Sequence, residues 1–162
     1  MARKQAVGEM EDEMVAVGDA VRVYELGFHL DPELGAEEVK KAYQAVREVI
    51  GTKSTIVAEG EPQTVQLAYT ISRQETSGRR DFNSAYFCWI AYETSTDHHT
   101  EILAAANADK RVVRFIDLLT TKDAARHAVE IREFVAKAQE HVDEPEATVD
   151  VELDAALQNV AV

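Results

Sequence analysis

Apolar and polar residues begin to alternate at Val21, where the chain leaves an aperiodic N-terminal stretch. Residues 1–20 mix small, acidic and apolar types without a period, and we expect them to form a flexible extension. Large apolar side chains then occupy every second position, at Tyr24, Leu26, Phe28 and Leu30. This period of two predicts a half-buried strand.

The best-marked helix of the sequence follows this strand. The segment Asp31-Pro32-Glu33 has the composition of a helix start, with Asp31 as N-cap and Pro32 at the first helical position. Apolar residues then recur at helical spacing as far as Ile50, and Gly51 supplies a C-terminal stop. We therefore expect one helix between these two signals.

The rest of the chain alternates between strand-like and helix-like patterns. We expect a strand over 52–71, a polar loop over 72–83, a strand over 84–93, a helix over about 95–106, a strand over 112–119 and a third helix over about 121–140. The order β-α-β-β-α-β predicts an α+β fold of the ferredoxin-like, split βαβ type. Right-handed crossovers would place two helices on one face of a four-stranded antiparallel sheet.

These elements divide the chain into four segments. They are a flexible extension (1–20), a ferredoxin-like domain (21–120), a C-terminal helix (121–141) and an acidic disordered tail (142–162). Within the domain we expect Leu67–Ile71 and Tyr86–Tyr92 to form the central strand pair. Such a domain leaves the sheet face opposite its two helices bare unless a partner binds there.

Composition favours a cytoplasmic protein and argues against nucleic acid binding at first sight. The formal net charge is −13 over 162 residues, yet residues 1–20 carry −3 and residues 141–162 carry −6, which leaves a nearly balanced body. A local basic patch therefore remains possible. The sequence shows no leader and no apolar run of about 18 residues, and its single cysteine, Cys88, cannot form an internal disulfide.

Four segments together resemble a known family. They are Tyr24-Glu25 in the first strand, QLAYTI at 66–71, FNSAYFCWIAYE at 82–93 and RVVRFIDLL at 111–119. In this order and spacing they resemble the S6 family of bacterial small-subunit ribosomal proteins. The FNSAYF segment, with the long loop before it, resembles the form that this family takes in a branch found in small-genome candidate-phylum bacteria.

The resemblance implies a structural role rather than catalysis. Proteins of this family bind the central domain of small-subunit rRNA, and they pair with ribosomal protein S18 as a heterodimer. It implies no cofactor, no small-molecule substrate and no membrane partner. Family members often carry Lys or Arg just before LAY, whereas Val65 and Gln66 stand here, so we expect the arginine-containing loop to supply the RNA contact.

Five arginines are the candidate RNA-binding residues. Arg73, Arg79 and Arg80 lie within eight residues of one another in the polar loop, and the planar guanidinium group suits bidentate contact with phosphate. Arg22 and Arg114 join them at the first and fourth strands. The alternative for the loop is a solvated hairpin tip, and the alternative for Arg114 is an edge-strand charge that prevents aggregation.

Aromatic residues of the third strand are the candidate partner contacts. Alternation assigns Phe87 and Trp89 to one face, and Tyr86, Cys88, Ile90 and Tyr92 to the other. One set must belong to the core, and the other more readily meets a protein than bases. We expect Tyr86, Trp89, Tyr92 and, in the first strand, Glu25 to contact the partner protein.

Other chemistries find little support in the sequence. There is no nucleophile elbow, glycine-rich phosphate loop or zinc-ligand spacing, and the adjacent His98 and His99 point about 100° apart on a helix. Asp117 either faces solvent or pairs with an arginine. The rival to a ribosomal role is a regulatory domain that homodimerises through its sheet and binds a small molecule near Gly27 and His29.

Overall fold

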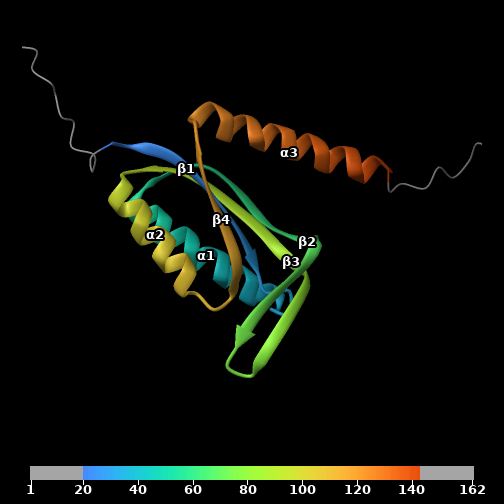
Figure 1. Ribbon diagram of the computed structural model, residues 1–162. Coiled ribbons are helices and arrows are strands. Elements are labelled where there is room, and N and C mark those ends of the chain that lie inside the picture. Colours follow the sequence, from blue (N-terminus) through green and yellow to red (C-terminus); the bar gives the residue numbers. More distant parts are fainter. Residues whose placement is uncertain (1–19, 143–162) are drawn as a thin grey trace, which may run out of the picture. The chain divides into compact units, whose positions relative to one another are not determined.

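The computed structural model describes residues 20–142, with side chains as far as residue 138. Its elements are β1 (Arg22–Leu30), α1 (Ala36–Lys53), β2 (Thr55–Glu75), β3 (Gly78–Thr94), α2 (Thr96–Ala108), β4 (Val112–Thr120) and α3 (Lys122–Val142) (Figure 1). The predicted N-terminal extension and acidic tail lie outside the described residues, except for residues 20 and 142. The contacts divide the chain into one unit that ends at Arg126 and another that begins at His127.

The first unit has the predicted ferredoxin-like fold. Its four strands form one antiparallel sheet in the order β2-β3-β1-β4, and α1 and α2 cover one face of that sheet. In β1, alternate residues Tyr24, Leu26 and Phe28 are buried beneath the helices, as their period of two predicts. Each large apolar side chain buried in this way contributes about 2 kcal/mol.

The start of α1 lies four residues later than predicted. Asp31 is not the N-cap; its carboxylate accepts the Glu33 backbone amide at 2.9 Å and is also bound by an arginine of β3. The helix begins at Ala36 after Gly35, whose amide donates to the Glu38 carboxylate. A tertiary ion pair has therefore outcompeted the local capping pattern.

The β2–β3 hairpin is longer than the sequence pattern predicts. The predicted polar loop over 72–83 is instead strand almost throughout, and the two strands meet at the short turn Thr76-Ser77. Gly78 follows this turn with φ of 125°, a backbone conformation that L side chains rarely adopt. The hairpin consequently extends beyond the sheet as an arm, residues 67–82, which Figure 1 shows in green.

A bulge separates this hairpin arm from the main sheet. The pairing passes from Gln66↔Ser84 directly to Ile71↔Phe82, so four residues of β2 lie opposite a single residue of β3. The predicted pairing of Leu67–Ile71 with Tyr86–Tyr92 is therefore wrong. The Tyr86–Tyr92 segment pairs with β1 on one side and with Ile56–Thr64 on the other.

Polar side chains join α1 to β2, and we call this group, Tyr43, Arg47 and Glu59, the polar clamp. The carboxylate of Glu59 accepts two hydrogen bonds from Arg47, at 2.6 and 3.0 Å, and one from the Tyr43 hydroxyl at 3.0 Å. The Arg47 hydrogen bonds are the main reason that the pKa of Glu59 lies below its ordinary value. Because the folded-state pKa is lowered, the clamp stabilises the fold fully above about pH 5 and less as pH falls.

Replacing Glu59 with glutamine is expected to lower the free energy of unfolding at pH 7 by about 1 kcal/mol, since the clamp is partly exposed. The same variant should lose less stability than the wild type between pH 5 and pH 3. Urea unfolding at several pH values measures both effects. Parallel pH profiles for the two proteins would contradict this account.

Candidate RNA and protein-binding surfaces

The sheet face opposite α1 and α2 carries exposed apolar side chains on β4. Strand register places Arg114 beside His29, Ile116 beside Gly27 and Leu118 beside Glu25. Ile116 is 56% exposed and Leu118 is 48% exposed. We call this surface the open face, and its residues are Glu25, Gly27 and His29 of β1, Phe87 and Trp89 of β3, and Arg114, Ile116 and Leu118 of β4.

Two of the four predicted partner contacts do not lie on the open face. Tyr92 has no exposed surface, and its hydroxyl bonds Nδ1 of His99 at 3.0 Å beneath α2. Tyr86 also points to the helix side and packs against the core. The structure therefore corrects the assignment of both tyrosines to the partner interface, because they share the face of Cys88, which the helices cover.

Glu25 and Trp89 do lie on the open face. Trp89 is only 5% exposed, and its indole covers Gly60 of the neighbouring strand β2, with which it is paired in the sheet. The glycine is required there, since a β-carbon at position 60 would lie 2.0 Å from the indole Nε1. The Trp89 side chain is therefore largely buried on this face and does not project from it.

Asp117 has a partner that neither sequence-based alternative named. Its carboxylate lies 2.9 Å from Nε2 of His99, and the His99 ring stacks on Tyr24 with centroids 3.6 Å apart. His99 thereby links α2 to β4, and through Tyr92 also to β3. Burial meanwhile raises the pKa of the Cys88 thiol to about 12, which suits a core residue and not a nucleophile.

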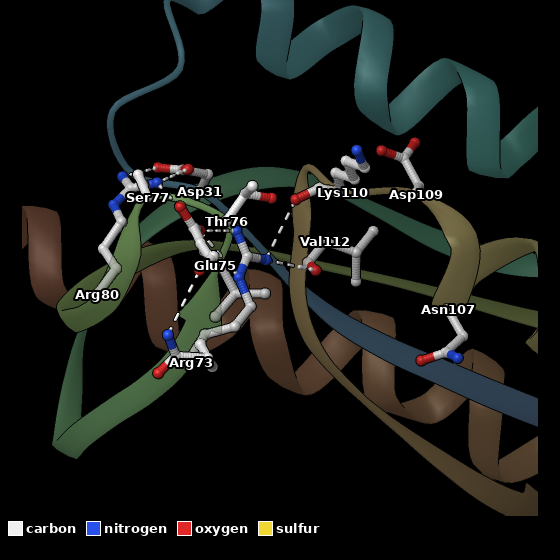
Figure 2. Close-up of a pocket in the computed structure, with 12 residues that line it drawn as sticks. Asp31, Arg73, Glu75, Thr76, Ser77, Arg80, Asn107, Asp109, Lys110 and Val112 are labelled. Atoms are coloured by element: carbon white, nitrogen blue, oxygen red, sulfur yellow. Dashed lines mark hydrogen bonds and ion pairs between the residues drawn. The ribbon is translucent and has the colours of Figure 1, made fainter.

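Two of the candidate RNA-binding arginines are held in an ion-pair network at the hairpin arm. They line a pocket between the arm and the turn that follows α2 (Figure 2). The volume of this pocket is about 650 Å³. Arg80 binds the Asp31 carboxylate through both terminal nitrogens, at 2.5 and 2.8 Å. Arg73 binds Glu75 and donates to the carbonyls of Lys110 and Val112, at 3.2 and 3.1 Å.

Because of these contacts, Arg73 and Arg80 have a structural role at the arm. The two guanidinium groups lie 5.3 and 4.6 Å from the centroid of the buried Phe82 ring, which they enclose. Burial alone would raise the pKa of Asp31, but the Arg80 hydrogen bond and the Glu33 amide outweigh it and hold that pKa below its ordinary value. The carboxylate is thus charged at neutral pH and keeps Arg80 occupied.

The other three candidate arginines are more exposed. Arg79 is 69% exposed in its side chain and bonds Asp81 and Ser72 at the surface of the arm. Arg114 contacts Tyr69 of the arm through a hydrogen bond and a cation–π contact at 5.4 Å. Arg22 lies at the other end of β1, seven residues and about 23 Å from the position that Arg114 faces.

Sequence reasoning missed three exposed residues of these surfaces, namely Ile116 and Leu118 on β4 and Tyr69 on the arm. Ile116 and Leu118 could have been found, because the segment RVVRFIDLL places them on one face by alternation. Tyr69, 63% exposed, lies within the LAY motif. Its displacement from the sheet depends on the bulge, which no local pattern of the sequence indicates.

Comparison with known proteins decides the family. The family model for ribosomal protein S6 matches residues 23–118, which is more than half of the chain and nearly the whole sheet domain. The chain belongs to the ribosomal protein S6 family. Membership and fold together identify a protein of the small ribosomal subunit, from a family with a structural role.

Solved structures similar to this S6 family member include two from Thermotoga maritima. The 30S ribosomal protein S6 is 16% identical, with 74% of this chain and 99% of that chain covered and a TM-score of 0.49. An uncharacterised protein is 13% identical, with 63% and 100% covered and a TM-score of 0.34. No curated protein matches the chain. Within residues 20–142, no helix is long and apolar enough to cross a membrane.

Proposed function

We propose that the chain binds small-subunit rRNA together with ribosomal protein S18, as a non-catalytic component of the ribosome in the cytoplasm. The family match over residues 23–118 is the observation that carries this proposal. The net charge of −13 is no obstacle, because most of the acidic excess lies at the two ends of the sequence.

The partner protein would occupy the open face at β4. Ile116 and Leu118 present adjacent apolar side chains there, on a strand at the sheet edge. Trp89 and Glu25, which the sequence also assigns to the partner, lie on the same face. Exposed apolar residues grouped on one sheet face favour contact with another protein.

RNA would contact the arginines at the hairpin end of the sheet. Arg114 and Arg79 are exposed there, while Arg73 and Arg80 serve mainly to hold the hairpin arm in place. Arg22 would touch RNA only at a separate point, because it lies at the opposite end of β1. Each phosphate neutralised should add about 0.7–0.9 to the magnitude of the salt slope of binding.

A matched pair of substitutions on β4 tests the partner surface. Ile116→Asp is expected to weaken S18 binding at least about tenfold, because it puts a charge in the apolar part of the interface. Leu119→Asp is the control, since Leu119 is 65% exposed on the same strand but on the opposite face. Isothermal titration of purified S18 measures both, and equal losses in the two variants would contradict the assignment.

Fractionation of a native lysate on a sucrose gradient tests the function as a whole. At low salt the protein is expected in the fractions that contain small subunits. Recovery only in the soluble pool would contradict the proposal. Light scattering of the purified protein adds a second check, since a tight homodimer that does not exchange with S18 would favour the regulatory alternative.

A further inference from the structure

Tyr69 occupies an unusual place for a tyrosine in a strand. The bulge between Gln66 and Ile71 lifts it out of the β2–β3 ladder, and the hairpin arm brings it to β4, three strands away in the sheet order. Its hydroxyl accepts a hydrogen bond from Arg114, and its ring is 63% exposed. The fold thus presents an aromatic ring to solvent at the hairpin end of the sheet.

The guanidinium group beside this ring, that of Arg114, is not neutralised by an acidic side chain of the described residues. Within residues 20–142, the Arg114 guanidinium contacts the hydroxyl and the ring of Tyr69 and forms no ion pair with a carboxylate. By contrast, Arg73 pairs with Glu75 of the arm, and Arg80 pairs with Asp31, which follows β1. An aromatic ring with an uncompensated guanidinium group beside it combines a stacking surface with a positive charge.

The neighbouring residues extend this surface without adding negative charge. His29 faces Arg114 across the β1–β4 pair, and the Phe87 ring lies 5.7 Å from the imidazole. Burial and then the Arg114 charge lower the pKa of His29, so its ring is neutral at pH 7. Two uncharged aromatic rings, those of His29 and Phe87, therefore adjoin Arg114.

We propose that Tyr69 stacks on an unpaired base of RNA while Arg114 contacts a phosphate of the same strand. This inference rests on the proposed rRNA-binding function and names the kind of nucleotide recognised. Single-stranded RNA exposes its base faces for stacking on aromatic side chains, whereas the grooves of an A-form duplex present only base edges and backbone. A duplex would leave the Tyr69 ring without a partner.

The test uses full-length protein with S18 and transcribed small-subunit rRNA. Tyr69→Ala is expected to weaken rRNA binding about 10-fold to 100-fold with an unchanged salt slope, because stacking is not ionic. Tyr69→Phe keeps the ring and should lose less than about fivefold. Arg114→Gln should reduce the magnitude of the salt slope by about 0.7, and Lys40→Gln, at an exposed lysine of α1 on the helix side of the sheet, is the control that should leave the slope unchanged.

Chemical probing of the rRNA gives the readout that a structural role would not reproduce. One unpaired base should be protected by the wild type and by Tyr69→Phe, and reactive with Tyr69→Ala. Equal protection by all three proteins would overturn the stacking proposal and leave rRNA binding intact. Weaker S18 binding by Tyr69→Ala without RNA would make Tyr69 a protein contact and also overturn it. Wild-type protein that binds no rRNA would refute the proposed function itself.

Discussion

Replacement of Gly60 with alanine is expected to lower the free energy of unfolding by about 1–3 kcal/mol, the usual cost of overpacking. The new β-carbon would lie 2.0 Å from Nε1 and 2.7 Å from two ring carbons of Trp89. Trp89 is 5% exposed, so the indole cannot move aside without disturbing the sheet around it. Urea unfolding followed by tryptophan fluorescence measures the change.

Gly51 provides the matched control for this substitution. It lies within α1, and a β-carbon there would have no heavy atom within 4 Å beyond its own helix backbone and chain neighbours. Gly51→Ala should therefore stabilise the fold by about 0.5–1 kcal/mol through helix propensity. The two alanine substitutions should thus have opposite signs. A neutral or stabilising Gly60→Ala would show that the indole does not cover Gly60.

Replacement of Arg80 with leucine is expected to lower the free energy of unfolding at pH 7 by about 2–4 kcal/mol. The substitution removes both hydrogen bonds to Asp31, whose side chain is only 12% exposed, and leaves its charge without the main partner. Arg79→Leu is the control on the same arm. It should change stability by less than about 1 kcal/mol, because its ion pair is exposed.

The Arg80→Leu effect should also depend on pH. In the wild type the pKa of Asp31 lies below its ordinary value of 3.8, so the pair stabilises the fold above that value and less as pH falls below it. Without Arg80, the pKa of Asp31 loses the hydrogen bond that lowers it most, so the variant's carboxylate protonates at a higher pH than the wild type's. The difference in unfolding free energy between the two proteins should therefore shrink from pH 7 to pH 3. A constant difference would mean that Asp31 does not carry the effect.

Local patterns predicted the elements whose stability comes from burial on one side. The period of two in β1 and the helical spacing of apolar residues in α1 are both present, because each is fixed by nearby residues. The outer part of the hairpin arm, residues 72–82, escaped prediction because it is almost entirely polar, so alternation between core and solvent cannot mark its strands. Pairs such as Ser72 with Asp81 hold the arm through side-chain hydrogen bonds instead.

The candidate site was predictable in its residue types but not in its geometry. Arg80 looked available because Asp31, its main partner, lies 49 residues away in the sequence. Tyr92 looked like a surface aromatic because both faces of β3 are apolar, and only the helices decide which face is covered. Such choices depend on contacts between distant segments, which a single sequence pattern does not contain.

The sheet order has a consequence for how the chain is made. β1, synthesised first, is a central strand and pairs with the last strand, so that Tyr24 faces Leu119 across about 95 residues of sequence. A nascent chain contains both neighbours of β1, the strands β3 and β4, only after it has been synthesised as far as residue 120. The nascent chain must therefore leave one edge of β1 unpaired until residue 120 has emerged, although β3 can pair with the other edge earlier. Closure of these non-local pairs is expected to be slow, and the sheet cannot be completed before β4 has been synthesised.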